Sequence, residues 1–100
     1  MSMKYKYVLM HTDGRTEDIT ADAPFSLKTL QMYVGGLIQE VPMPDGSRLI
    51  CNDEGKLIGL PINPRATKLW NELYPIDKYP IGNDGYVVGD VIHAIPERRH

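Results

Sequence analysis

Residues 52–70, NDEGKLIGLPINPRATKLW, contain in direct succession a turn, an apolar run, a helix start and an amphipathic helix. The DEG at 53–55 is typical of a turn, because Gly tolerates positive φ and short polar side chains bond to the nearby backbone. The apolar run that follows predicts a strand over Lys56–Leu60. Asn63 can cap a helix through its side-chain oxygen, and Pro64 then occupies the first helical position, where proline is favoured.

The helix that begins at Pro64 has two chemically different faces, as expected for a helix packed on a protein core. Its apolar face comprises Ala66, Leu69, Trp70 and Leu73, and its outward face comprises Arg65, Lys68 and Glu72.

A second apolar stripe predicts a longer helix, from Leu27 to Val41, with Ser26 as its cap. Its members recur every three or four residues: Leu27, Leu30, Val34, Leu37 and Val41. Pro42 ends the pattern, since proline lacks the backbone donor. Gly35-Gly36 in the middle is unusual, because two interior glycines cost a helix about 2 kcal/mol. They indicate either a kink or close packing, or a bare backbone surface that a ligand or second subunit can approach.

Strand patterns occupy most of the remaining chain. Tyr5–His11 and Thr16–Thr20 flank the hairpin signal Asp13-Gly14, and the second of these strands is polar enough for a sheet edge. Arg48–Asn52 and Tyr86–Ile95 are further strand candidates, and residues 74–85 form a predicted loop. The order is β-β-α-β-β-α-β. It predicts one α+β domain over residues 1–100, with two helices packed on a mixed or antiparallel sheet.

Composition restricts the function classes. The formal net charge of −2 argues against a nucleic-acid binder. Cys51 is the only cysteine, so we expect no internal disulfide and a reducing, cytoplasmic location. No apolar run approaches the roughly 20 residues of a membrane helix, so no membrane contact is expected.

Catalytic and metal-binding patterns are weak, and we expect neither an enzyme nor a bound cofactor or metal. Cys51 lies in an apolar strand, where a free cysteine usually acts as a small hydrophobic residue. His11 and His93 could meet on neighbouring strands and bind a metal with Asp90, but no dedicated metal-ligand spacing is present.

Four short motifs resemble a small uncharacterised family, a domain of unknown function of phages, plasmids and bacteria. They are YVGG at 33–36, NDEGKL at 52–57, GLPIN at 59–63 and GDVI at 89–92. The resemblance covers about the last two-thirds of the chain. It implies a mobile-element context, and hence an accessory, anti-defence role in the cytoplasm of a bacterial host.

The leading functional hypothesis is non-catalytic sequestration of a small anionic ligand of nucleotide type. A helix N-terminus with two nearby cations favours negative charge. Asn63, Arg65 and Lys68 would therefore hold the charge, while Tyr33 and the backbone of Gly35-Gly36 would shape the pocket. The simpler interpretation is that Asn63 only caps the helix and the two cations are solvated.

An alternative hypothesis is a protein–protein inhibitor that docks a host protein through a sheet edge or the aromatic loop Tyr74–Tyr79. A small enzyme is the third possibility. A core of this size is marginal, and a homo-oligomer is a common way to stabilise it.

Overall fold

The computed structural model describes residues 4–73 and 86–97, which form an α+β domain with two α-helices and a five-stranded antiparallel sheet. The elements are β1 (Lys4–Met10), β2 (Thr16–Asp18), the 3-10 helix η1 (Thr20–Asp22), α1 (Leu27–Val34), β3 (Ile38–Pro42), β4 (Arg48–Asn52), α2 (Pro64–Leu73) and β5 (Val91–Glu97). The strand order across the sheet is β2-β1-β5-β4-β3, and each neighbouring pair is antiparallel. The predicted fold class, α+β with two helices packed on a sheet, is therefore confirmed. The sheet was predicted to be mixed or antiparallel, and it is antiparallel.

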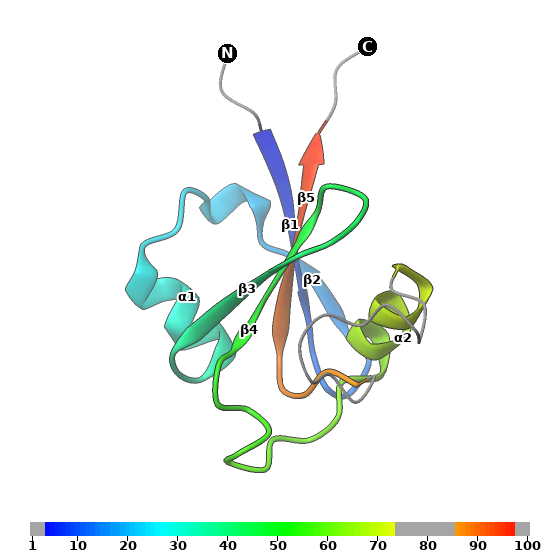
Figure 1. Ribbon diagram of the computed structural model, residues 1–100. Coiled ribbons are helices and arrows are strands. Elements are labelled where there is room, and N and C mark those ends of the chain that lie inside the picture. Colours follow the sequence, from blue (N-terminus) through cyan, green and yellow to red (C-terminus); the bar gives the residue numbers. More distant parts are fainter. Residues whose placement is uncertain (1–3, 74–85, 98–100) are drawn as a thin grey trace.

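The two helices cover opposite faces of the sheet (Figure 1). Successive residues of a strand point to opposite faces, so each central strand contributes to both cores. Leu9, Ile50 and Ile92 pack with Val34 of α1, in the first core. The neighbouring residues Met10, Leu49 and Val91 pack with Ala66 and Trp70 of α2, in the second core.

The predicted helix over Leu27–Val41 is wrong in its second half. Ser26 caps α1 as expected, because its Oγ accepts a hydrogen bond from the Thr29 N–H at 3.1 Å. The helix ends at Val34, and Gly35 is its C-cap in the left-handed conformation with φ 80°. Glycine adopts that conformation without steric cost, so the glycine pair ends the helix. The residues beyond it form β3, which pairs with β4 from Ile38↔Asn52 to Pro42↔Arg48.

Three further segments differ from the predicted elements. One is the last strand, which was predicted over Tyr86–Ile95 and forms as β5 only from Val91 to Glu97. The predicted strand Lys56–Leu60 is a compact turn, in which the N–H groups of Ile58 and Leu60 donate to the carbonyls of Glu54 and Gly55. The predicted strand Thr16–Thr20 stops at Asp18, and η1 follows it. The turn at Lys56–Leu60 finds its backbone hydrogen-bond partners within a few residues instead of on a neighbouring strand. Beyond the end of β2, the Ile19 N–H still donates to the Tyr7 carbonyl on β1 at 2.9 Å. The predicted loop 74–85 lies outside the described residues.

Candidate functional site

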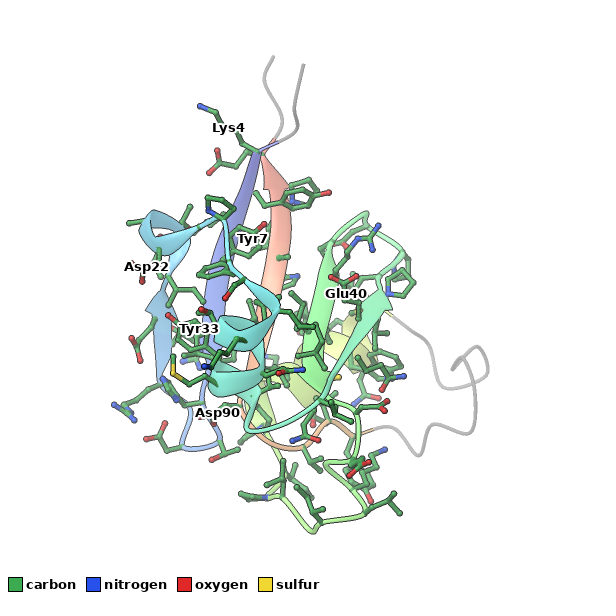
Figure 2. The ribbon with its side chains drawn as sticks, turned by 90° about the vertical axis from the view of Figure 1, so that its left-hand side faces the viewer. Lys4, Tyr7, Asp22, Tyr33, Glu40 and Asp90 are labelled. Carbon is green, nitrogen blue, oxygen red and sulfur yellow. The ribbon has the colours of Figure 1, made fainter. Side chains whose placement is uncertain are left out.

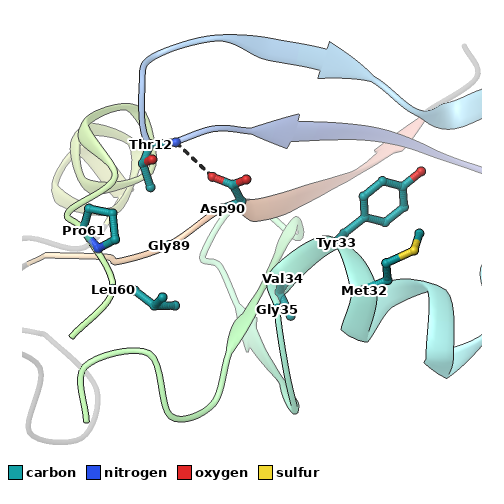
Figure 3. A pocket seen from close by; sticks show the side chains of 9 residues that line it. All are labelled: Thr12, Met32, Tyr33, Val34, Gly35, Leu60, Pro61, Gly89 and Asp90. Atoms are coloured by element: carbon teal, nitrogen blue, oxygen red, sulfur yellow. Dashed lines mark hydrogen bonds between the residues drawn. The ribbon is translucent and has the colours of Figure 1, made fainter. Parts of the chain in front are cut away.

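A pocket of about 350 Å³ opens at the end of the sheet where β5 begins (Figure 3). Four segments that are distant in sequence meet there: the end of β1, the end of α1, the loop before α2 and the residues just before β5. The described lining residues are Thr12, Met32, Tyr33, Val34, Gly35, Leu60, Pro61, Gly89 and Asp90. A volume in this range suits one amino-acid side chain or a small molecule.

Asp90 is the ionisable carboxylate of this lining, and the backbone holds it in place. Its Oδ1 accepts a hydrogen bond from the Thr12 N–H at 3.0 Å, drawn in Figure 3. Its Oδ2 lies 3.1 Å from Nδ1 of His11, whose Nε2 lies 2.7 Å from Oε1 of Glu17. The imidazole therefore bridges a carboxylate on β2 and the carboxylate in the pocket. Figure 2 shows Asp90 near the end of α1 that carries Tyr33.

Gly89 brings the chain close to the opposite wall of the pocket. Its φ is 77°, and a Cβ added there would lie 2.8 Å from Cδ1 of Leu60. Both facts favour glycine, because other residues rarely adopt this conformation and a side chain would displace Leu60. The close approach is fixed by a hydrogen bond from the Gly89 N–H to the Pro61 carbonyl at 2.8 Å.

Asn63 lies fully buried behind the pocket and joins three parts of the chain. Its Oδ1 accepts from the Ala66 N–H at 3.0 Å, which confirms the predicted helix cap. Its Nδ2 donates to the carbonyls of Met10 at 2.9 Å and Gly89 at 2.8 Å. Both N–H groups of the Asn63 amide therefore donate within the protein, and its oxygen accepts a bond there. It positions the pocket and does not itself face a ligand.

The six residues predicted to bind a ligand do not form one site. Tyr33 and Gly35 line the pocket. Gly36 lies next to it but packs on Asn52, because an added Cβ would be 2.9 Å from Asn52 Nδ2. Asn63 is buried, as described above. Arg65 and Lys68 are exposed on α2 and are not among the described lining residues.

Arg65 nevertheless has a partner of its own. Its Nε donates a hydrogen bond to the Gly14 carbonyl in the turn between β1 and β2. At the start of α2, Pro64 has no N–H to donate, and the Ala66 N–H is bonded to Asn63. The helix N-terminus therefore offers fewer donors to an anion than the sequence pattern suggested.

Most of the large exposed apolar side chains lie on segments that adjoin the lining residues of the pocket. The described residues expose six large apolar side chains, and five of them belong to these segments. These five are Met32, Leu37, Leu57, Ile58 and Ile62. Leu57 is the most exposed, at 87%. The turn that carries Leu57 and Ile58 is stabilised by the backbone hydrogen bonds of Ile58 and Leu60 described above. The backbone conformation therefore keeps these two side chains exposed to solvent.

Sequence reasoning did not find most of this site. It paired His11 with Asp90, and the structure brings those two together, but as an ion pair with Glu17 instead of a metal site with His93. His93 bonds Ser47 Oγ at 3.0 Å, on the α2 face. The sequence places Leu60 in a predicted strand and Pro61 in the motif GLPIN, and it assigns neither to a site. The signal in the sequence was the run of Leu57, Ile58 and Leu60 directly after a predicted turn. Exposed apolar patches are uncommon on soluble proteins and usually mark interaction sites.

The other reactive candidates are ordinary structural groups. Burial raises the pKa of the Cys51 thiol to about 11, so Cys51 is protonated at neutral pH and a poor nucleophile. Within residues 4–73 and 86–97, no three histidine, cysteine or acidic side chains are arranged to hold a metal ion. None of the helices in this described part is long and apolar enough to cross a membrane.

The His11 bridge predicts a pH dependence of stability. The hydrogen bond to Glu17, and more weakly that to Asp90, raises the pKa of His11, against the opposing effect of desolvation. Only the protonated imidazole can donate to both carboxylates at once. A raised folded-state pKa stabilises the fold below the unfolded value of about 6.5, and this contribution is lost as pH rises through the folded pKa. Urea unfolding from pH 6.5 to 9 should therefore show a loss of about 0.5 kcal/mol, typical of such pairs.

Glu17→Gln is the matched variant for this measurement. It removes the stronger of the two contacts, so its unfolding free energy should vary less over the same pH range. Two other groups also change the stability over this pH range, because desolvation lowers the pKa of His93 and burial raises the pKa of the Cys51 thiol. Their contributions are the same in wild type and Glu17→Gln, so the difference between the two proteins reports the His11 bridge. An unchanged pH dependence in Glu17→Gln would assign the effect to another group.

The fold and the site together define a small α+β domain with a pocket and an exposed apolar loop at one end of its sheet. The chain belongs to the DUF3846 family, a domain of unknown function, whose model matches residues 3–97. Comparisons with curated proteins and with solved structures find no match.

Proposed function

We propose that this domain docks a protein partner through an apolar end surface. It is defined as the exposed side chains of Met32, which lines the pocket, and of Leu37, Leu57, Ile58 and Ile62, which lie within three residues of its lining residues in the sequence. The observation that carries the proposal is the exposure of Leu57 at 87% and of Ile58 and Ile62 at 57% each, on a loop with its own backbone hydrogen bonds. Exposed apolar side chains that gather in this way usually mark an interaction surface.

The partner that we propose is a protein of a bacterial host, and the domain is an accessory protein of a phage or another mobile element that acts inside that host. This setting rests on the family resemblance of the four motifs and is consistent with the DUF3846 assignment. Leu57 ends the motif NDEGKL, and Ile58 stands between that motif and GLPIN. Blocking a host protein requires binding but no chemistry of its own, which suits the groups described above.

Site-specific photo-crosslinking in host cells tests the docking surface. A photoreactive phenylalanine analogue replaces Leu57 in one variant and Leu27 in the control, since Leu27 is also exposed, at 59%, but begins α1 away from the pocket. We expect the Leu57 variant to form an adduct with one host protein that mass spectrometry identifies. Purified, that protein should bind the wild type at least tenfold more tightly than the variant Leu57→Ser/Ile58→Ser, because each buried aliphatic side chain contributes about 1.5–3 kcal/mol.

Two outcomes would contradict this function. Equal adducts from Leu57 and Leu27 would mean that the loop has no specific partner. An adduct of Leu57 with a second copy of the chain alone would make the end surface a homo-oligomer interface, which was the oligomeric state expected from the small core. Sedimentation equilibrium of the wild type and the double variant separates that case from host-protein docking.

A second candidate function retains the small anionic ligand, bound at the start of α2. The observation in its favour is that Arg65 and Lys68 are exposed on the first turns of that helix, where negative charge is stabilised. This site is separate from the pocket, so the two candidates can be tested independently.

Arg65→Ala is the test of this second candidate. The change removes charge-assisted hydrogen bonds worth about 1.5–3 kcal/mol, so binding of adenosine monophosphate, used as a nucleotide-type probe, should weaken roughly ten- to a hundredfold. Arg65→Lys should recover part of the affinity, because the charge remains and the planar donor fork is lost. Titration calorimetry gives the affinities, and Arg48→Ala on β4 is the matched control. If the wild type does not bind the probe, or Arg65→Ala binds it equally well, the anion site is wrong.

A further inference from the structure

The charge of the pocket is negative. Asp90 is an acidic lining residue, and the described lining contains neither lysine nor arginine. Asp90, His11 and Glu17 form one connected group, which carries a net charge of −2 when the imidazole is neutral and −1 when it is protonated. Either state leaves negative charge beside the pocket. Arg15 is paired with Asp13 through a 2.6 Å contact, and it also interacts electrostatically with Glu17 and Asp90. Arg15 and Asp13 together carry no net charge, so counting both leaves the sum of −2 or −1 unchanged.

The C-terminus of α1 adds to that charge. Val34 and Gly35 line the pocket, and they are the last helical residue and the C-cap of α1. The peptide dipoles of a helix leave a partial negative charge of roughly half an elementary charge at its C-terminus, which favours cations. A carboxylate and a helix C-terminus therefore face the same cavity.

Asp90 keeps acceptor capacity for a ligand. A carboxylate has about four lone-pair positions, and the contacts with Thr12 and His11 account for two of them. The Asp90 side chain is 36% exposed, so water and ligands can reach it. The two contacts also fix the carboxylate, which lowers the entropy cost of binding.

The walls of the pocket are suited to an alkyl chain beneath a planar cation. Met32, Leu60 and Pro61 supply apolar surface, and Tyr33 lines the pocket from α1, with its ring edge-to-face against Phe25 and its hydroxyl directed away from Asp90 (Figure 3). A guanidinium stacks on an aromatic face and bonds a carboxylate through its planar fork, whereas an ammonium is a more strongly hydrated point charge.

We infer that the pocket takes an arginine side chain of the docked protein, with the guanidinium at Asp90 and the alkyl chain against Leu60 and Pro61. This inference rests on the proposed docking function. It adds a polar anchor to the apolar end surface: Leu57 and Ile58 cover apolar groups of the partner, and Asp90 selects a partner with an arginine beside them. Such pairing of an apolar contact with one charged anchor is common in protein interfaces.

The probe is N-acetyl-arginine methylamide, titrated into ¹⁵N-labelled protein. Its uncharged counterpart is N-acetyl-citrulline methylamide, which has almost the same shape. We expect the arginine probe to shift the amide signals of Thr12, Gly35, Gly89 and Asp90 at concentrations at which the citrulline probe does not. Asp90→Asn keeps the shape of the side chain and its acceptor for the Thr12 N–H, and should weaken the arginine probe about tenfold. Glu17→Gln, which touches His11 outside the pocket, should weaken it less than threefold.

Each result supports or overturns the inference. Equal shifts from the arginine and citrulline probes, or shifts that lie outside the pocket, overturn it. If Asp90→Asn fails to fold, Tyr33→Leu replaces it, and N-acetyl-lysine methylamide is titrated beside the arginine probe. The wild type should then bind the arginine probe more tightly than the lysine probe, and Tyr33→Leu should not. The docking function is judged separately by the Leu57 crosslink. A crosslink whose yield is the same in wild type and in Asp90→Asn would leave docking intact and overturn the arginine anchor.

Discussion

Asn63→Ala is expected to lower the free energy of unfolding by about 3–5 kcal/mol. The change removes the cap of α2, which contributes about 1 kcal/mol, and leaves the carbonyls of Met10 and Gly89 without their buried donor. Each unsatisfied buried group costs about 1–3 kcal/mol. Denaturant unfolding of wild type and variant measures the difference.

Asn63→Asp separates the cap from the two donor bonds. Aspartate keeps the acceptor for the Ala66 N–H but places a carboxylate against the two carbonyls, so this nearly isosteric variant should lose at least about 2 kcal/mol. Asn71→Ala is the control, because Asn71 lies on the exposed side of the same helix and its Nδ2 donates a hydrogen bond to the Thr67 carbonyl one turn earlier. If Asn63→Asp is as stable as the wild type, the donor bonds to Met10 and Gly89 do not stabilise the fold as described.

Ile92→Ala should cost about 2–5 kcal/mol, the usual effect of truncating a fully buried aliphatic side chain. Ile92 has no exposed surface and lies in the middle of the α1-side core, opposite Leu9 on β1 and Ile50 on β4. Its loss leaves a cavity where three strands meet, and the rigid sheet cannot close over it. Thermal and denaturant unfolding should both report the loss.

The graded control for this position is Ile92→Val, which removes a single methylene and should cost about 0.5–1.5 kcal/mol. Ile62→Ala removes the same atoms as Ile92→Ala from a side chain that is 57% exposed, and should have little effect on stability. Similar losses from Ile62→Ala and Ile92→Ala would contradict the assignment of Ile62 to a surface and Ile92 to the core.

Local signals predicted the elements whose hydrogen-bond partners are also local. The cap at Asn63 and the cap at Ser26 are confirmed, because a side chain and an N–H three residues away decide each of them. The apolar stripe failed at Gly35, since Leu37 and Val41 continue a helical spacing but are recruited into or next to a strand. Residues 38–42 form β3 because they pair with β4. The three- and four-residue spacing of apolar side chains carries no information about such pairing.

One signal for β3 was present in the sequence. Asp45-Gly46 repeats the pattern of Asp13-Gly14, and both are hairpin turns with a glycine at positive φ, 89° and 92°. The backbone bonds match as well: Met43 N–H donates to Ser47 as His11 N–H donates to Arg15, each at 2.9 Å. Applying the hairpin rule to both pairs would have predicted a strand before Pro44.

The pocket was less predictable than the elements. Tyr33 and Gly35 were predicted to bind a ligand, and they line the pocket; Thr12, Pro61 and Asp90 join them there because β1, α1 and β5 converge at one end of the sheet. Their chemistry is readable in the sequence, and their proximity is not. Arg65 and Lys68 show the same limit from the other side. Two cations at a helix N-terminus are a favourable local pattern for an anion, but the sequence does not show whether a cavity lies beside them.

The strand order has a consequence for the time at which the protein can fold during its synthesis. β5 is made last among the described strands, yet it lies between β1 and β4, and it alone joins the β1–β2 hairpin to the β3–β4 hairpin. A ribosome-bound chain that ends before Val91 can form two separate hairpins but no continuous sheet. Both cores then stay exposed to water, because an isolated hairpin is marginally stable at best. The nascent protein should remain sensitive to proteases until residues 91–97 have left the ribosome, and should then become resistant in a single step.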